Sequence, residues 1–451
     1  MATRAEPADT AEALGRALGG QVSGLRRLSG GASRVTSSFD LESAGVTRPL
    51  ILQQIRGDGA AEEGKIGVEQ ALLKAAAAVG VPVPAVVAMG HGDELGAGWL
   101  VVERLDGETI PRKILRDEEW DGARAALTDQ CGTALAAIHT IDPGTIDGLA
   151  TKDPLRRPLP FLDALGEVRP ALELGVRWLE SHRPTASSTV TVHGDFRNGN
   201  LLVGPEGLRA VLDWELAHAG DAAEDIGWLC APAWRFGGAG EVGGFGDLDD
   251  LLAAYRSAGG EAIEPARVHW WQVYATVKWA TICALQASVH LSGATRSVEL
   301  AAIGRRVCEN EWDLCRLLGL VPSSEAPTPS ARAEVVAPFG RPTAAELVEA
   351  VREYLERSVM ARSEGGARFE ARVARNALSI VERQLALGPA LETAQAERLA
   401  ALGFDDDRAL AAAIRAGTFD DDWTEVGAAL AAAARDQLLV ANPGYLPAAS
   451  E

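Results

Sequence analysis

The sequence predicts an α+β protein in three parts: a small β-rich N-terminal lobe, a mainly helical middle part and a small all-helical C-terminal domain. Strand-like runs around one inserted helix fill residues 1–105, and helical patterns dominate residues 106–320 apart from a β-rich patch at 190–214. A proline-rich linker at 321–342 then precedes a purely helical pattern at 343–451. A chain of 451 residues is long enough for two or three domains.

The N-terminal lobe is expected to hold antiparallel strands around one longer helix. Apolar and β-branched residues predict the strands, and a pair of glycines ends the first helix. The expected elements are a helix at 9–18, strands at 22–28, 35–41 and 49–55, a helix at 62–79, and strands at 85–89 and 99–105. A glycine-rich turn separates the first two strands.

The C-terminal domain is predicted as amphipathic helices. Apolar side chains recur near a period of 3.6 at 345–359, and a second helix is expected at 369–387, ended by Gly388-Pro389. Acidic triplets at 405–407 and 420–422 are expected at helix starts, where carboxylates stabilise the helix dipole, with a metal site as the alternative. An Ala- and Leu-rich tail of this kind can contact a second copy, so the sequence allows a homo-oligomer.

Composition excludes some classes of protein. The net charge is −20, which argues against a nucleic-acid partner because phosphate backbones are bound mainly by Lys and Arg. Hydrophobic residues make up 47% of the chain, which excludes disorder over most of its length. Only five of the 43 basic residues are lysines.

The five cysteines and the hydropathy pattern predict a cytoplasmic protein without a membrane partner. The cysteines are scattered and form no CxxC pair, as is typical of reduced, buried thiols. The N-terminus has no apolar core of a signal peptide, and the most apolar stretch, residues 426–434, is too short to span a bilayer.

The segment TVHGDFRNGNLLVGPEGLRAVLDWE carries the clearest chemistry. Asp195 follows a short strand, Asn200 comes five residues later, and Asp213 lies 18 residues after Asp195 at the end of a strand. Phosphoryl transfer needs a carboxylate to accept the proton of the attacking hydroxyl, and an amide oxygen and a second carboxylate to hold Mg²⁺. Asp195 fits the first role and Asn200 and Asp213 the second. The alternative is a pair of ordinary turns, in which Asp and Asn are common.

These residues resemble the aminoglycoside phosphotransferase and choline kinase-like superfamily. The resemblance runs from about residue 22 to 318, and HGDFRNGNLL, LDWELAHAGDAAEDIGWLC and WRFG are most similar to phosphotransferases linked to acyl-CoA dehydrogenases. The C-terminal segment resembles a helical domain of unknown function that follows such kinases. The resemblance implies a bilobal protein-kinase-like fold, ATP and Mg²⁺ as cofactors, and a hydroxyl on a small molecule as acceptor.

The resemblance also implies roles for single residues. Asp195 would be the catalytic base, and Asn200 and Asp213 the metal ligands. His193 is expected to hold the loop through a backbone carbonyl. Arg197, two residues after the base, is a candidate to stabilise charge on the γ-phosphate, with an exposed arginine as the alternative.

The nucleotide is expected at the N-terminal lobe. Backbone amides and hydroxyls of the glycine-rich turn would cover the phosphates, and the connector VVERL would bind the adenine through its main chain. Glu69 stands where the family has the glutamate that pairs with the phosphate-binding cation. The residues assigned to the nucleotide are Ser29, Gly30, Gly31, Ser33, Gln53, Glu69, Glu103 and Leu105.

At Gln53 the sequence departs from the family. The strand PLILQQI should offer a Lys or Arg to the α- and β-phosphates near this position, but Gln53 is neutral. Arg34, Arg56 or Lys65 are the nearby cations that can replace it. If none does, the chain is expected to be a catalytically silent nucleotide-binding or scaffold module.

The acceptor is less defined by the sequence. Arg235 could hold a carboxylate or phosphate, Trp270 and Trp271 could line an apolar slot, and Glu215 could reach a metal-bound water. Core packing or a structural role is the alternative for each. A hydroxyacyl or other anionic metabolite is favoured, and an aminoglycoside is the alternative that the acidic net charge allows.

Overall fold

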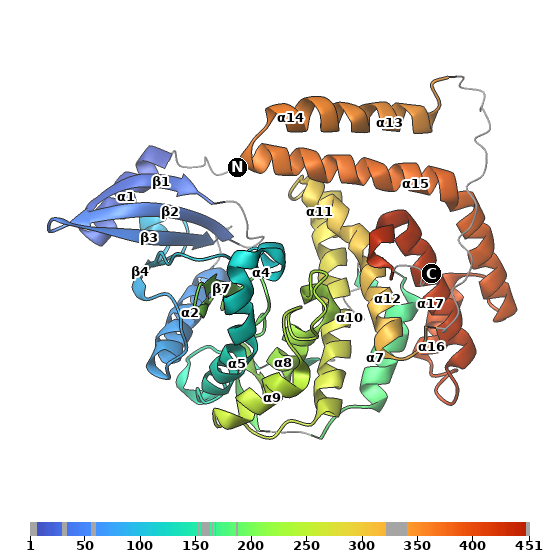
Figure 1. The fold of residues 1–451 in the computed structure, drawn as a ribbon, viewed down its shortest axis with the longest axis horizontal. Coiled ribbons are helices and arrows are strands. Elements are labelled where there is room, and N and C mark those ends of the chain that lie inside the picture. Colours follow the sequence, from blue (N-terminus) through green and yellow to red (C-terminus); the bar gives the residue numbers. More distant parts are fainter. Residues whose placement is uncertain are drawn as a thin grey trace. The chain divides into compact units, whose positions relative to one another are not determined.

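The computed structural model describes residues 7–28, 34–55, 60–151, 153–154, 163–164, 166, 168–185, 188–321 and 341–447. A β-rich N-terminal sheet followed by a mainly helical remainder confirms the predicted α+β class (Figure 1). The chain divides into two compact units. One comprises residues 1–152 and 185–271, and the other comprises residues 153–184 and 272–451.

The first unit begins with a five-stranded antiparallel sheet of order β1-β2-β3-β5-β4. All the strands expected in this lobe are present, with ends shifted by up to three residues. The elements are α1 (Pro7–Leu18), β1 (Gln21–Arg27), β2 (Arg34–Ser43), β3 (Val46–Ile55), α2 (Ala60–Ala78), β4 (Val86–Gly90), α3 (Gly92–Leu95) and β5 (Trp99–Glu103).

The core of this sheet fixes its register. Alternate residues of β2, β3 and β5 are buried together with Leu14 of α1. Because side chains alternate between the two faces of a strand, a slip by one residue would expose the whole set. Gln53 is paired with Thr36 on β2 and with Leu100 on β5.

Helices and two small two-stranded antiparallel sheets complete the first unit. The helices are α4 (Pro111–Arg116), α5 (Asp121–Ile138), α8 (Ala222–Cys230), α9 (Leu248–Ser257) and the first part of α10 (Pro265–Leu291). Helix α5 packs closely on α9 because Gly132 has no side chain: a Cβ there would lie 2.7 Å from the Cβ of Ala254. The strands are β6 (Thr189–Val192), β7 (Leu201–Gly204), β8 (Gly207–Val211) and β9 (His218–Asp221).

The second unit is helical. It contains α7 (Pro170–Ser181), the rest of α10, α11 (Val298–Ile303), α12 (Val307–Leu317), α13 (Ala344–Tyr354), α14 (Met360–Arg362), α15 (Gly365–Ala401), α16 (Asp407–Arg415) and α17 (Thr424–Ala441). A π-helical turn at Leu355–Val359 joins α13 to α14. Helices from the predicted middle part and from the predicted C-terminal domain therefore belong to one compact unit.

A common core joins these helices. Leu174 of α7 and Cys315 of α12 are buried against Leu410 and Ile414 of α16 and Leu430 of α17. Arg415 also forms ion pairs with Asp163 and Glu173. The burial of apolar surface between α7 and α12 on one side and α16 and α17 on the other is the main stabilising contribution in this core.

The prediction that Gly388-Pro389 ends a helix is wrong. Helix α15 continues through both residues, and Figure 1 shows that it changes direction along its length. Proline removes a backbone donor and its ring presses on the preceding turn, which bends a helix without always ending it.

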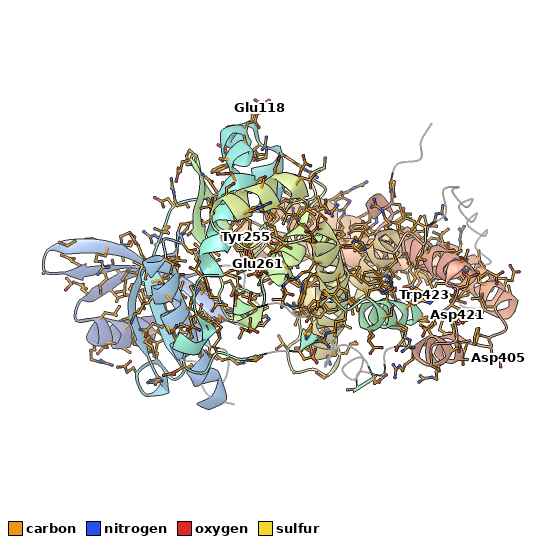
Figure 2. The ribbon with its side chains drawn as sticks, turned by 90° about the horizontal axis from the view of Figure 1, so that it is seen from below. Glu118, Tyr255, Glu261, Asp405, Asp421 and Trp423 are labelled. Atoms are coloured by element: carbon orange, nitrogen blue, oxygen red, sulfur yellow. The ribbon has the colours of Figure 1, made fainter. Side chains whose placement is uncertain are left out.

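The acidic triplets lie at the starts of α16 and α17, where Asp407 is the first residue of α16 and Figure 2 labels Asp405, Asp421 and Trp423. Asp406 accepts a hydrogen bond from the amide of Ala409 at 2.8 Å, and Asp422 accepts one from the amide of Thr424 at 2.9 Å. The expectation that they stand at helix starts is confirmed. Over the residues that the structure describes, no three or more His, Cys, Asp or Glu side chains are grouped so that they could hold a metal ion.

All five cysteines are free and buried, as the sequence predicted. Burial raises the pKa of Cys283, Cys308 and Cys315 to about 12, so these thiols are protonated at neutral pH. In the described part of the chain, no helix has the length and apolar character needed to cross a bilayer.

Candidate active site

Two loops that connect the two-stranded sheets hold the residues of the expected site. Residues 193–200 connect β6 to β7, and residues 212–217 connect β8 to β9. The amide of Leu212 donates to the carbonyl of Asn200 at 2.8 Å, which joins the two loops. Gly194 has a φ of 77°, and a Cβ there would lie 2.5 Å from the carbonyl oxygen of Leu216, so only glycine fits at this crossing.

Asp225 of α8 anchors the loop of residues 193–200. Its two carboxylate oxygens accept hydrogen bonds from the amides of His193 and Gly194, both at 2.8 Å, and His139 lies 3.3 Å away. Tyr255, labelled with Glu261 in Figure 2, is 2.8 Å from the other nitrogen of His139. Burial would raise the pKa of Asp225, but the hydrogen bonds from the ring of His139 and from the amide of His193 outweigh it and the pKa is lowered.

His193 holds the loop as expected. Its Nε2 lies 3.1 Å from the carbonyl oxygen of Leu212, and its Nδ1 accepts from the amide of Asp195 at 3.2 Å. Complete burial lowers its pKa, so the ring is neutral and suited to this donor and acceptor pair.

Three donors surround the carboxylate of Asp195. Oδ1 accepts from Trp228 Nε1 at 2.8 Å and from Arg197 Nε at 3.0 Å. Oδ2 accepts from Asn200 Nδ2 at 2.6 Å. The side chain is only 12% exposed, so these bonds fix its orientation in a site largely shielded from water.

Trp228 and Trp234 were missed by the sequence analysis. Trp228 bonds Asp195 directly, and the guanidinium of Arg197 lies 4.5 Å from the ring centre of Trp234. The two indoles contact each other with ring centroids 5.3 Å apart. A buried indole N–H usually needs a hydrogen-bond acceptor. Trp228 lies three residues after Asp225 on α8, and this spacing was the signal in the sequence that could have identified it.

Asp213 has a strained backbone conformation, and its side chain lies near other carboxylates. Its φ is 65°, a left-handed conformation that is uncommon for an aspartate, and the strand before it ends at Val211. Burial raises its pKa to about 7, with further contributions from the charges of Glu215, Asp195 and Glu69, opposed by Arg34. A divalent cation would relieve this accumulation of negative charge.

Asn200 and Asp213 fit a magnesium ion by their chemistry. Asn200 donates through Nδ2 to Asp195, so its Oδ1 is the atom left to bind a metal. One carboxylate and one amide oxygen are hard ligands, and Mg²⁺ in nucleotide sites is usually held by one or two such groups together with substrate phosphates. A pair of this kind does not amount to a preformed metal cluster.

Arg34 is the cation that the structure places beside Gln53. Its guanidinium forms an ion pair with Glu69 of α2, and its Nη1 donates to Gln53 Oε1 at 3.4 Å. Its Nε lies 3.4 Å from Glu215 Oε2. Arg34 and Glu69 are both buried. Burial raises the pKa of Glu69, and Arg34 opposes this effect.

The structure describes some of the other residues that were expected to bind the nucleotide. Strand β5 ends at the exposed Glu103, and Leu105 lies on the coil that follows, as expected for a connector between lobes. Ser29, Gly30, Gly31 and Ser33 lie outside the described residues, as does Arg56. Lys65 is described and is exposed on α2.

Most of the residues expected at the acceptor contact other groups of the protein. Arg235 donates to the carbonyl of Cys230 at 2.9 Å and lies 3.7 Å from Glu241. Trp270 and Trp271 are buried and pack edge to face with centroids 4.9 Å apart. Their contact with a substrate stays a prediction.

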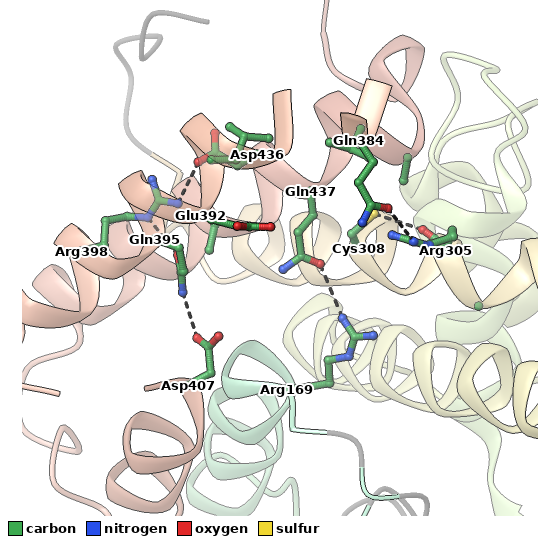
Figure 3. A pocket seen from close by; sticks show the side chains of 16 residues that line it. Arg169, Arg305, Cys308, Gln384, Glu392, Gln395, Arg398, Asp407, Asp436 and Gln437 are labelled. Atoms are coloured by element: carbon green, nitrogen blue, oxygen red, sulfur yellow. Dashed lines mark hydrogen bonds and ion pairs between the residues drawn. The ribbon is translucent and has the colours of Figure 1, made fainter. Parts of the chain in front are cut away.

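A cavity of about 260 Å³ lies in the second unit (Figure 3). Side chains around it bond one another: Arg398 donates to Asp436 at 2.7 Å, Gln395 to Asp407 at 2.8 Å, and Arg169 to Gln437 at 3.5 Å. Asp407, from the acidic triplet for which a metal site was the alternative, is among the residues that line this cavity.

The lobed α+β fold, the loop with Asp195 and Asn200, and the neighbouring Asp213 define a kinase-like phosphotransferase. The model of the phosphotransferase enzyme family matches residues 24–271, and the chain belongs to that family. Residues 361–445 match a domain of unknown function.

The chain is also similar to several known proteins. Acyl-CoA dehydrogenase family member 10 of Mus musculus is 31% identical over 174 residues, which is 35% of this chain but only 16% of the mouse protein. A crystal structure of a putative aminoglycoside phosphotransferase from Ralstonia eutropha aligns with a TM-score of 0.54 and 23% identity, covering 68% of this chain and 98% of that one. Spectinomycin phosphotransferase, solved with ADP and spectinomycin, aligns with a TM-score of 0.50 and 14% identity over 69% of this chain and 98% of its own.

Proposed function

We propose that the protein transfers the γ-phosphate of ATP to a hydroxyl group of a small metabolite, with Mg²⁺ as the metal. The observation that carries this proposal is the environment of Asp195, a shielded carboxylate held by three donors in a loop whose D-x-x-x-x-N spacing matches the kinase catalytic loop. This geometry suits a group that must be aimed at one hydroxyl and accept its proton.

Asp195 accepts the proton of the acceptor hydroxyl while that oxygen forms its bond to the transferred phosphorus. The bound Mg²⁺–ATP supplies the electrophilic phosphorus, and the bond to the bridging oxygen breaks to leave ADP. Trp228 and Asn200 keep the Asp195 carboxylate in one orientation through their hydrogen bonds. Asn200 Oδ1 and Asp213 would hold the metal.

Arg197 would stabilise the charge of the transferring phosphate. Its Nε is bonded to Asp195, and its guanidinium carbon lies 4.5 Å from the ring centre of Trp234, so two contacts restrict the position of the fork. An arginine so placed can direct its remaining N–H groups towards a phosphate near the base.

The acceptor in this proposal is a hydroxyacyl or other anionic metabolite. The support is the similarity to the mouse acyl-CoA dehydrogenase family member, which covers a small part of that protein. Arg235, Glu215, Trp270 and Trp271 remain the candidate acceptor residues. Phosphorylation of an aminoglycoside is the second candidate, because spectinomycin is bound in the solved structure of one similar phosphotransferase.

The decisive experiment separates an enzyme from a silent module. A metabolite pool containing hydroxyacyl compounds is incubated with ATP, Mg²⁺ and either the wild-type chain or Asp195→Ala, and phosphorylated products are identified by mass spectrometry. A phosphorylated hydroxyacyl product formed only by the wild type supports the proposal. Binding of Mg²⁺–ATP without any phosphorylated product from a broad pool that includes aminoglycosides would favour the silent nucleotide-binding module.

A further inference from the structure

A cation near position 53 of β3, where the proposed phosphoryl transfer calls for one, is missing from the sequence. In protein kinases a lysine of this strand holds the nucleotide phosphates and pairs with a glutamate of the following helix. Here the strand carries Gln53, and Glu69 stands on the helix. Without another cation the buried carboxylate of Glu69 would be unpaired, which is costly in free energy.

Arg34 fills this gap from the neighbouring strand. Arg34 is the first residue of β2, which pairs antiparallel with β3. Its long side chain donates a hydrogen bond to Gln53 and forms an ion pair with Glu69. The ion pair with Glu69 and the 3.4 Å approach to Glu215 place the guanidinium between the helix and the loop of Asp213. Arg34 is therefore held by the glutamate that would normally hold the lysine.

Arg34 is the positive counter-ion in a group of negatively charged side chains. Glu69, Glu215 and Asp213 are all close enough to affect one another, with Arg34 as the opposing positive charge. An arginine keeps its charge even when it is buried, and its planar fork can bond a carboxylate on one edge and a phosphate on another.

We propose that Arg34 is the residue that binds the α- and β-phosphates of the nucleotide, a role moved from β3 to the start of β2. The inference rests on the proposed function, since it concerns the same nucleotide site. It predicts that the function of the missing lysine was transferred and not lost, which argues against the silent module.

The test is calorimetric binding of ATP and of adenosine to the full chain in the presence of Mg²⁺, compared among variants. Arg34→Ala is expected to weaken ATP binding by about tenfold or more, because a charged hydrogen bond to phosphate is lost. Adenosine, which has no phosphates, is expected to bind equally to wild type and variant. The double variant Arg34→Ala/Gln53→Lys, with the cation restored on β3, is expected to recover most of the ATP affinity.

Arg48→Ala is the matched control, because Arg48 is an exposed arginine at the other end of β3. It is expected to bind both ligands as the wild type does. Equal affinity of Arg34→Ala and wild type for ATP would overturn the inference while leaving the proposed function intact. Equal losses for ATP and adenosine would also overturn it, because they would indicate a purely structural ion pair. Failure of the wild type to bind ATP would count against the proposed function itself.

Discussion

At the scale of single residues, the orientation of one carboxylate governs the site. Asp195 is bonded by an indole, a guanidinium and an amide, which come from α8 and from its own loop. Each donor removes one way in which the carboxylate could turn. A base held in this manner loses little further freedom when the acceptor binds, which lowers the entropic part of the barrier.

Asp195→Asn tests the role of the carboxylate with little change in shape. The amide cannot accept a proton, so kcat is expected to fall by about 10²–10⁴-fold, the usual contribution of a general base. The affinity for Mg²⁺–ATP measured by calorimetry is expected to stay close to that of the wild type. A variant that keeps more than half of the wild-type kcat would contradict the assignment of Asp195 as base.

Trp228→Phe tests the indole donor. The phenyl ring keeps most of the apolar contact but cannot donate to Asp195, so kcat is expected to fall by about tenfold, the equivalent of one charged hydrogen bond. The KM for ATP is expected to remain unchanged, which steady-state kinetics can separate.

Trp99→Phe is the matched control for that substitution. Trp99, on β5, is equally buried and donates to Glu94 of α3 at 3.1 Å. It is expected to lower the melting temperature but not kcat. Equal kcat losses in both variants would show that the effect of Trp228 comes from general destabilisation.

The sequence could predict the catalytic loop because its residues lie in one continuous stretch with fixed spacing. Asp195 and Asn200 are five positions apart on a loop between two short strands, so local geometry alone brings them together. The pairing of Arg34 with Glu69 depends on how far a side chain reaches from β2 to α2. Spacing along the chain carries no information on that reach, and three cations therefore stayed open as candidates.

At the scale of elements, close helix packing decides which glycines are needed. Gly388 lies within the continuous helix α15, and a Cβ there would meet its nearest neighbours at 3.9 Å, an ordinary contact. Gly175 lies in α7, and a Cβ there would lie 2.7 Å from Leu314 Cδ2 and 3.1 Å from Val277 Cγ2. The same residue type is replaceable in one helix and required in the other.

Gly388→Ala and Gly175→Ala therefore form a matched pair of a tolerated and a costly substitution. Gly388→Ala is expected to change the free energy of unfolding by less than about 1 kcal/mol, because the helix preference of alanine is offset by the contact of its Cβ with the ring of Pro389, and no contact beyond the chain neighbours is too close. Gly175→Ala is expected to lower it by about 1–3 kcal/mol through overpacking. Denaturant unfolding of the full chain measures both, and a Gly388→Ala variant that loses as much stability as Gly175→Ala would contradict this difference in packing.

The same helix shows why element boundaries are hard to predict. The dipeptide Gly388-Pro389 is a typical stop signal in a sequence, yet α15 runs from Gly365 to Ala401. Leu391 and Leu399 lie beyond the proline and are buried in the unit. Tertiary packing of those leucines stabilises a turn that local preference alone would break.

At the scale of the whole molecule, the C-terminal helices are part of a core that the sequence divided between two domains. The predicted boundaries at residues 320 and 342 followed composition, because a proline-rich stretch is typical of a linker. Contacts between distant segments have no signature in composition. Ala171 and Leu174 of α7 share their cluster with Leu410 and Ile414 of α16, more than 200 positions later.

Ile414→Ala tests whether this core is cooperative. Ile414 is buried, so the variant is expected to lose about 2–5 kcal/mol of unfolding free energy through lost apolar contact and a residual cavity. Hydrogen exchange followed by mass spectrometry is expected to show faster exchange in α7 and α12 as well as in α16 and α17, because the four helices bury one another's apolar faces. Leu385→Ala, at an exposed position of α15, is the control and is expected to leave exchange unchanged. Faster exchange confined to residues 343–451 would mean that the C-terminal helices unfold by themselves, and the common core would then not act as one cooperative unit.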